Sequence, residues 1–270
     1  MENDDSSSYL RDIADCLWSG HASLMVGAGF SKNASDEFLS WNCLANTIYE
    51  NLYQEKPTEP NIPILFQEIE DDPDKGQNIL YKELNKVLPN TTPPSELHKK
   101  LLNLPWKDVF TTNYDTLLER TNSTRDYYTI LREQDLYLSS SPRIIKLHGS
   151  LPNGPFIITE DDYDNYPQKY KLFFHTVQQA FIEGPIILVG FSGNDSNFLK
   201  WTHWINDNIY KIKPKIYLIN ASKIKSLEKN RFENKNILPI DYFCKETNNP
   251  QKAITHFIEY LESLRPVQTT

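Results

Sequence analysis

The sequence has few cysteines, and none of them is placed for a disulfide framework or a metal site. Its 270 residues contain three, Cys16, Cys43 and Cys244, which lie far apart and never form a C-x-x-C pair. Disulfide frameworks and structural zinc sites use several closely spaced cysteines. We therefore expect no metal site and a reducing, cytoplasmic environment.

Long apolar runs and targeting signals are also missing. The longest apolar stretch, residues 185–191, is far shorter than the roughly 20 residues that a membrane-spanning helix needs. The first six residues are acidic and polar, and no apolar segment of a signal peptide follows them. The sequence predicts a cytoplasmic protein without a membrane partner.

A surplus of basic residues is absent as well. The 36 Asp and Glu residues outnumber the 28 Lys and Arg residues, which gives a formal net charge of −8 at pH 7. Because proteins that bind nucleic-acid backbones usually present a basic surface, we expect no direct binding of nucleic acid. With 39% hydrophobic residues, the chain is long enough for one large core.

Short apolar segments alternate with segments of helical periodicity along the chain, which predicts an open, mostly parallel α/β sheet. We expect one domain over residues 1–270, with a small helical insertion over 56–105, whose first part is rich in Pro, Asn, Asp and Glu. Ser40 and Ser95 are expected to cap helices. Strands are predicted at 24–26, 108–113, 127–131, 143–147, 154–159, 185–189, 215–219 and 237–240. Helices are predicted at 9–19, after 40, 95 and 115, at 161–183 with a break at Pro167, after 197, and at 254–264.

The first predicted strand stops at a glycine turn, Gly27-Ala28-Gly29-Phe30-Ser31. A strand that feeds such a loop begins many dinucleotide sites, because glycine lets a ligand approach the backbone and the amide groups bind phosphate. The third glycine of the usual G-x-G-x-x-G pattern is replaced by Lys32 or Asn33. By itself the turn leaves a nucleotide site and an ordinary strand-to-helix connection equally open.

Polar or glycine-containing clusters follow four predicted strands, at 27–31, 111–115, 148–150 and 190–195. In an open α/β sheet, ligands bind beyond the carboxyl ends of the strands. Any single cluster is compatible with an ordinary turn that is capped by Ser, Asp or Asn. Four such clusters at four strand ends favour a shared ligand site.

Together the clusters resemble the ordered motifs of the sirtuin superfamily, and most closely the divergent sirtuin-like domains of bacterial antiphage defence systems. The segments are Gly-Ala-Gly-Phe-Ser at 27–31, Thr-Thr-Asn-Tyr-Asp at 111–115, Lys-Leu-His-Gly-Ser at 146–150 and Gly-Phe-Ser-Gly-Asn-Asp at 190–195. The resemblance covers roughly residues 20–245. It implies a Rossmann-like sheet with helices on both faces, a helical insertion, and NAD+ as the ligand.

The resemblance also implies roles for single residues. Asn113 would hold a water or the reacting ribose beneath the nicotinamide-bearing carbon, and His148 would be the catalytic histidine. Asp115 would lie near the nicotinamide carboxamide, and Asn220 would contact the adenosine ribose. The residues implied in NAD+ binding are Gly27, Ala28, Gly29, Phe30, Ser31, Asp115, Gly190, Ser192, Asp195 and Asn220.

These residue types suit NAD+ cleavage on physical grounds. Nicotinamide leaves as a neutral group through a cation-like ribosyl centre, so the reaction needs positioning and a placed water. An asparagine amide donates and accepts hydrogen bonds at once, and an imidazole accepts a proton near neutral pH. The other histidines, His98 among them, lack metal-ligand spacing and are interpreted as structural. We interpret the aromatic stretch 163–181 as core packing or an oligomer contact.

Two features of protein-deacylating sirtuins are absent: the paired zinc cysteines, and the Gly-Ile-Pro-x-Phe-Arg segment, where residues 36–41 read Asp-Glu-Phe-Leu-Ser-Trp. Without an evident channel for a peptide, water is the expected acceptor. The resemblance therefore predicts an NAD+ glycohydrolase that makes nicotinamide and ADP-ribose. Its expected role is that of a toxic effector, which depletes NAD+ in abortive antiphage defence.

Two alternatives stay open at this point. One is an NAD+-dependent protein deacylase or ADP-ribosyltransferase, and the other is a non-catalytic module that senses NAD+ or ADP-ribose. For the NAD+ glycohydrolase we expect control by homo-oligomerisation, by a sensor or partner protein, or by further domains of a longer protein.

Overall fold

The computed structural model describes residues 4–191, 196–208, 215–220, 222, 224–245, 247 and 249–267. Its strands are β1 (Ser23–Val26), β2 (Asp108–Thr111), β3 (Tyr128–Ile130), β4 (Arg143–Lys146), β5 (Ile186–Val189), β6 (Ile216–Ile219) and β7 (Ile237–Ile240). They form one seven-stranded sheet in the order β3-β4-β2-β1-β5-β6-β7. Every neighbouring pair is parallel. The α/β prediction is confirmed, and the sheet is parallel throughout.

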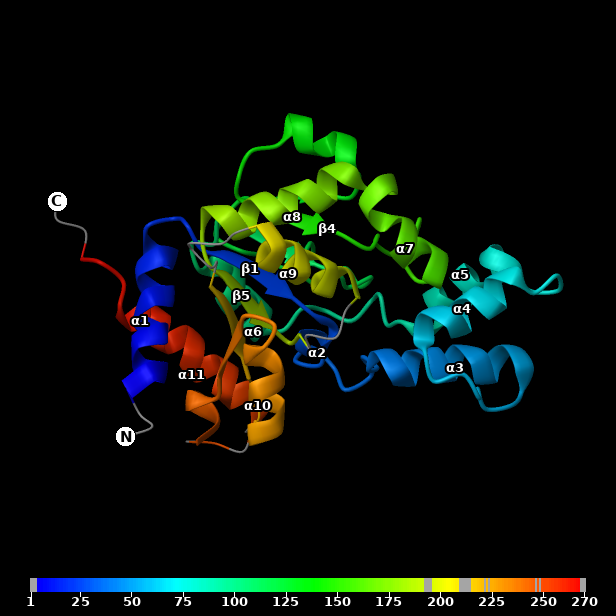
Figure 1. The fold of residues 1–270 in the computed structure, drawn as a ribbon, viewed down its shortest axis with the longest axis horizontal. Coiled ribbons are helices and arrows are strands. Elements are labelled where there is room, and N and C mark those ends of the chain that lie inside the picture. The colour runs from blue at the N-terminus through cyan, green and yellow to red at the C-terminus, as the bar shows by residue number, and fades with distance from the viewer. Residues whose placement is uncertain are drawn as a thin grey trace.

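Helices pack on both faces of this sheet, as Figure 1 shows. One face is covered by α1 (Asp4–Trp18), α6 (Glu96–Asn103) and α11 (Pro250–Ser263). The other face is covered by α7 (Glu160–Lys169), α8 (Lys171–Glu183), α9 (Ser196–Asn208) and α10 (Ser226–Glu233). The short helices are α2 (Ala28–Ser31) and the 3₁₀ turns η1 (Glu133–Leu138) and η2 (Tyr242–Lys245).

Side chains of the central strands alternate between the two faces, as a pleated strand requires. In β1, Leu24 and Val26 pack with α1, α6 and α11, whereas Met25 packs with the helices of the opposite face. All residues of β1 and β5 are buried. A strand that is buried on both faces has a nearly continuous apolar sequence, which is why these two strands were visible in the sequence.

Three further helices, α3 (Trp41–Tyr53), α4 (Ile62–Asp71) and α5 (Gly76–Val87), form a small bundle at the right of Figure 1. Their apolar stripes meet in a separate core that holds Ile48, Phe66 and Leu80. α6, the last helix of the 56–105 segment, packs against α11 beside the sheet instead. The bundle thus includes α3, which precedes that segment, and the boundaries of the insertion stay a prediction.

The predicted caps are found with one difference. Ser40 precedes α3, and its side chain accepts a hydrogen bond from Cys43 N–H at 3.3 Å. Ser95 precedes α6, but its side chain makes no capping hydrogen bond to the helix backbone. Its Oγ lies 2.9 Å from Nδ1 of His98 instead. A side-chain partner has therefore replaced the backbone amide that a capping serine usually binds.

Two predicted elements are absent from the structure. Residues 154–159 form no strand. Their apolar side chains pack into the core of the helical bundle and into one core beside the sheet. Their backbone is hydrogen-bonded to the hydroxyl groups of Tyr81 and Tyr114 and not to a neighbouring strand. After Asp115 only a turn forms, over residues 117–120. Oδ1 of Asp115 accepts the N–H of Leu117 at 3.1 Å, which holds the chain in an Asx-type turn and not in a longer helix.

The break in the helical stretch 161–183 falls at Tyr170 and not at Pro167, which lies inside α7. A proline inside a helix leaves the carbonyl four residues earlier without its usual amide donor. That carbonyl belongs to Tyr163, and Nζ of Lys200 on α9 donates to it at 2.6 Å. The replacement donor explains how the helix continues through the proline.

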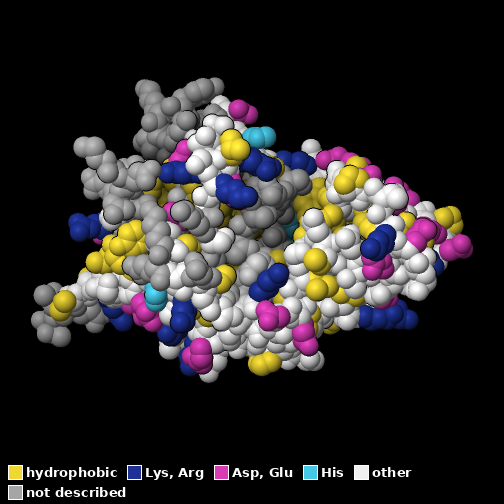
Figure 2. All heavy atoms as spheres, turned by 90° about the horizontal axis from the view of Figure 1, so that it is seen from below, with side chains coloured by type: hydrophobic (Ala, Val, Ile, Leu, Met, Phe, Trp, Pro, Cys, Tyr) yellow, Lys and Arg dark blue, Asp and Glu magenta, His cyan; other side chains and the backbone are white. Residues whose placement is uncertain are grey.

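Within the described residues, no helix has both the length and the apolar character for crossing a bilayer. The face seen in Figure 2 carries acidic and basic side chains in an interspersed arrangement, without a continuous area of one charge. The predictions about membranes and nucleic acid stay predictions.

We predict that Leu188→Ala, in the centre of β5, lowers the free energy of unfolding by about 2–5 kcal/mol, because the side chain is fully buried. The matched control is Leu227→Ala, whose leucine is 86% exposed and whose effect should stay within about 0.5 kcal/mol. Chemical denaturation of both variants checks this. Equal effects at the two positions would contradict the described core.

Candidate active site

The four sequence clusters follow four neighbouring strands of the sheet, β4, β2, β1 and β5. After β1 the chain forms β2, β3 and β4 on one side of this strand, and then crosses to β5 on its other side. The strand order therefore reverses between β1 and β5, which is the place where open α/β sheets bind ligands. The sequence clusters thus converge on the carboxyl edge around this switch point.

The two glycine loops touch each other at the switch point. Gly29 N–H donates to the carbonyl of Gly190 at 2.9 Å, and Gly27 N–H donates to that of Val189 at 3.0 Å. A Cβ on Gly27 would lie 2.5 Å from the Gly190 oxygen, and one on Gly190 would lie 2.2 Å from the Phe30 nitrogen. Glycine is required here for close packing of two backbones, and both amides are bonded within the protein.

A hydrogen-bonded trio connects the first glycine loop to the loop after β2. Nδ2 of Asn113 donates to Oγ of Ser31 at 3.1 Å, and this hydroxyl donates to Oδ2 of Asp115 at 2.8 Å. All three side chains are buried. Oδ1 of Asn113 is also buried and has no hydrogen-bond partner among the described residues. Buried acceptors are rarely left unsatisfied, so this atom is suited to bind a water or a ligand hydroxyl.

His148 occupies the matching position at the end of β4. Thr111 on β2 is paired with Lys146 on β4, so Asn113 and His148 each lie two residues beyond the same pair. Leu147 N–H donates to Thr111 O at 2.9 Å, which continues the pairing toward the site. The structure therefore places Asn113 and His148 at equivalent positions beyond the ends of adjacent strands.

Two aromatic residues that the sequence motifs do not include surround His148. The rings of Tyr163 and Tyr166 meet its imidazole edge to face, with centroid distances of 5.4 and 5.8 Å. The hydroxyl of Tyr166 also donates to the carbonyl of Leu147 at 3.0 Å. Their spacing of three residues indicated one face of a helix, but nothing in the sequence pairs that face with β4.

His98 is the second histidine of the site region. Its ring is buried and lies 4.7 Å from the ring of Phe30 in the glycine loop. Burial lowers the pKa of His98 to about 4, although the charge of Asp115 acts in the opposite direction. The imidazole is therefore neutral at physiological pH, which agrees with a structural role beside the loop.

The remaining predicted site residues lie farther along the sheet. Asn220 follows β6, where its N–H donates to Ile240 O at 2.9 Å and its carbonyl accepts from Sγ of Cys244 at 2.8 Å. β6 is the neighbour of β5, so Asn220 stands one strand beyond the Gly190 loop. The predicted residues Ser192 and Asp195 lie outside the described residues.

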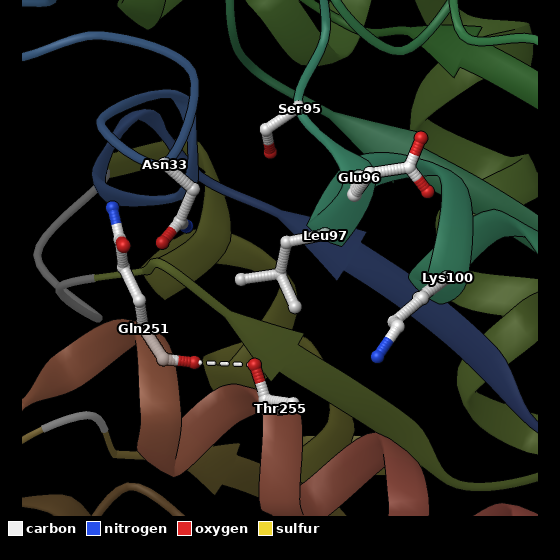
Figure 3. A pocket seen from close by; sticks show the side chains of 7 residues that line it. All are labelled: Asn33, Ser95, Glu96, Leu97, Lys100, Gln251 and Thr255. Atoms are coloured by element: carbon white, nitrogen blue, oxygen red, sulfur yellow. Dashed lines mark hydrogen bonds between the residues drawn. The ribbon is translucent and has the colours of Figure 1, made fainter.

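A cavity of about 270 Å³ lies behind the glycine loop, between α6 and α11. Figure 3 shows Leu97 in its centre, with the side chains of Asn33 and Gln251 on one side and Lys100 on the other. Another cavity, of about 580 Å³, is lined by Trp18, Arg125 and Arg265. Neither cavity includes Asn113 or His148 in its lining.

In the described part of the chain, no cluster of His, Cys, Asp or Glu could hold a metal ion.

The central part of the chain matches a known protein family. Residues 107–240, which run from the start of β2 to the end of β7, match the family model described as "SIR2-like domain". The chain contains a SIR2-like domain. The loops with Asn113 and His148, and that with Gly190, lie within the matched residues.

Relatives of the chain include one protein named for a role in defence and one named for NAD+ hydrolysis. "Defense-associated sirtuin 2" of Bacillus subtilis is 26% identical over 86% of the chain, and "NAD(+) hydrolase ThsA" of Enterococcus faecium is 26% identical over 72% of it. The matches cover 24% and 41% of those two proteins, so the chain spans well under half of their lengths. A structure of Sir2Tm bound to a propionylated peptide aligns with a TM-score of 0.48 and 10% identity, over 95% of this chain and 97% of that one.

We predict that Gly190→Ala strongly destabilises the protein, because the residue has φ +65° and its new methyl group would overlap the Phe30 backbone. Gly20→Ala is the matched control, since Gly20 has φ +76° but no atom within 4 Å of the added Cβ. The control should lose about 1–2 kcal/mol of unfolding free energy from backbone strain alone. Thermal and chemical denaturation compare the two. A smaller loss for Gly190→Ala than for Gly20→Ala would contradict the described contact.

His98 should make stability depend on pH. Its pKa falls from 6.5 to about 4 on folding, so the unfolded chain binds more protons between these values. The stabilising contribution is complete above pH 6.5 and is lost as the pH falls to about 4, by at most about 3 kcal/mol. The variant His98→Gln stays neutral and should show a flatter dependence of unfolding free energy on pH over this window. Parallel curves for the two proteins would contradict the assignment.

Proposed function

We propose that the SIR2-like domain hydrolyses NAD+ to nicotinamide and ADP-ribose. The observation that carries the proposal is the amide of Asn113: its Nδ2 is fixed by Ser31, and its buried Oδ1 has no partner among the described residues. His148 stands at the equivalent end of the adjacent strand. Names of relatives support the same reaction, since one of them is called an NAD(+) hydrolase.

In this proposal, Oδ1 of Asn113 accepts a hydrogen bond from the attacking water or from a ribose hydroxyl. Nicotinamide departs as a neutral group, and the oxygen of water bonds to the ribose carbon that it leaves. His148 accepts the proton that is released in this step, as an imidazole can near neutral pH. The amide of Asn113 is held before substrate arrives, so little reorganisation is needed during the reaction.

Asp115 and the glycine loops would bind the rest of the substrate. Oδ2 of Asp115 accepts from Ser31, and its carboxylate has further lone pairs for the nicotinamide carboxamide. The diphosphate would lie beyond the carboxyl ends of β1 and β5, next to the contact between the two glycine loops. Asn220, one strand farther along, would contact the adenosine ribose.

We further propose that this hydrolysis depletes NAD+ as an effector in antiphage defence. One relative is named a defense-associated sirtuin, and the chain corresponds to about a quarter of its length. An NADase that empties the cell must be kept inactive until it is needed. Control would come from homo-oligomerisation, from a partner protein or from further domains.

The proposal predicts that Asn113→Ala and His148→Ala each reduce nicotinamide release from NAD+ by about 10²-fold or more, because each removes a group that acts on the reacting atoms. Asn122→Ala and His203→Ala, both at exposed positions, are controls that should retain activity. Chromatography of nicotinamide and ADP-ribose, with the chain alone and in its assembled state, measures this.

The same assay separates the alternatives. Release of nicotinamide only in the presence of an acylated peptide would replace hydrolysis by deacylation. Tight binding of NAD+ without any product, in every assembled state, would indicate a sensing module and would contradict the proposed hydrolase.

A further inference from the structure

We propose that Lys146 and Glu119 are positioning residues, whose buried ion pair holds the two loops that carry Asn113 and His148 in a fixed relative position. Neither residue was singled out by the sequence motifs for a role in the site. The inference rests on the proposed function, since it concerns how the same site is kept in a reactive geometry.

Lys146 is the last residue of β4, and its side chain is completely buried. Its Nζ lies 2.9 Å from Oε1 of Glu119 and also donates to the backbone carbonyl of Asp115. One ammonium group thereby ties the end of β4 to the loop after β2. Asp115 lies two residues from Asn113, so the contact fixes the segment that carries the proposed water-holding amide.

Glu119 extends the connection to the turn after His148. Its Oε1 accepts from Nζ of Lys146 and also from Oγ of Ser150 at 3.2 Å. Ser150 follows His148 by two residues, and Gly149 between them has φ +90°. One carboxylate oxygen from the segment after Asn113 therefore accepts hydrogen bonds from residues on both sides of His148.

Stability alone is a weak reason for such a pair. Removing two charges from water is unfavourable, and apolar side chains of similar volume often hold a core at least as well. The second oxygen, Oε2 of Glu119, is also buried and has no hydrogen-bond partner among the described residues. Apolar contacts are not directional. The hydrogen bonds of this pair, in contrast, fix the relative positions of Nζ of Lys146, Oε1 of Glu119 and Oγ of Ser150.

The expected kinetic effect is on the chemical step. In the proposed site, NAD+ would be bound mainly through the glycine loops after β1 and β5, which the pair does not touch, so the KM for NAD+ should change little. Misplacement of reacting groups by about 1 Å lowers rates by about 10²-fold. Variants of the pair should therefore lower kcat for nicotinamide release about 10–100-fold, with KM within about twofold of wild type.

The experiment compares Glu119→Gln, Lys146→Met and the double variant with wild type. Three quantities are measured: kcat and KM for NAD+, the thermal unfolding midpoint, and hydrogen–deuterium exchange of peptides that cover 111–119 and 147–151. The control is the corresponding pair of substitutions, Glu83→Gln with Lys86→Met, at an ion pair of 2.7 Å in the helical bundle.

The double variant decides between positioning and plain stabilisation. Because removing both charges leaves no unpaired buried charge, it should be more stable than Lys146→Met alone. We expect its kcat to stay low all the same, with faster exchange in both peptides, while the control pair keeps wild-type kcat. Recovery of kcat together with stability would overturn the proposal, and so would full activity of folded Glu119→Gln.

Failure of this inference is distinguishable from failure of the proposed function. If wild type cleaves NAD+ and the variants cleave it equally fast, the pair has no positioning role and the hydrolase stands. If wild type cleaves no NAD+ in any assembled state, the hydrolase proposal fails. The exchange measurement then still tests whether the pair orders the two loops, and unchanged exchange in the variants overturns that as well.

Discussion

The contact between two backbones at Gly29 and Gly190 is the constraint on which the rest of the site depends. It joins the ends of β1 and β5 at the point where the strand order reverses, and no side chain fits between them. Once the first glycine loop is held there, Ser31 follows within hydrogen-bond distance of Asn113 and Asp115. A close approach of main chains at the switch point thus determines which polar side chains can meet above the sheet.

The parallel register supplies the second requirement. Neighbouring strands that end together bring residues from distant parts of the sequence to one edge. Because Thr111 is paired with Lys146, Asn113 and His148 reach that edge at the same distance beyond the pair. A shift by one residue would direct either side chain to the opposite face, since side chains alternate along a strand. The site is in this sense a property of the sheet and not of any single loop.

Much of this arrangement could be predicted from the sequence, because its signals were local. The apolar runs that became β1 and β5 are bounded by glycine, and a strand end followed by Asn, Asp or His is visible without any partner. What escaped prediction depends on partners far away in the chain. Pro167 stays helical only because Lys200 reaches the carbonyl of Tyr163, and residues 154–159 are apolar because they fill cores. Lys146 begins the segment Lys-Leu-His-Gly-Ser, but nothing in the sequence pairs it with Glu119, and this contact holds its charge in the interior.

The position of β1 in the middle of the sheet also has a consequence for biosynthesis. One neighbour, β2, is complete at Thr111, but the other, β5, ends only at Val189. The first strand of this sheet to leave the ribosome is therefore the one whose second side is covered late. Until then it presents an open hydrogen-bonding edge flanked by apolar side chains, the kind of surface that favours association between nascent chains. Long-range pairing of this type also makes folding slow, so the growing polypeptide has a long interval in which this edge needs protection.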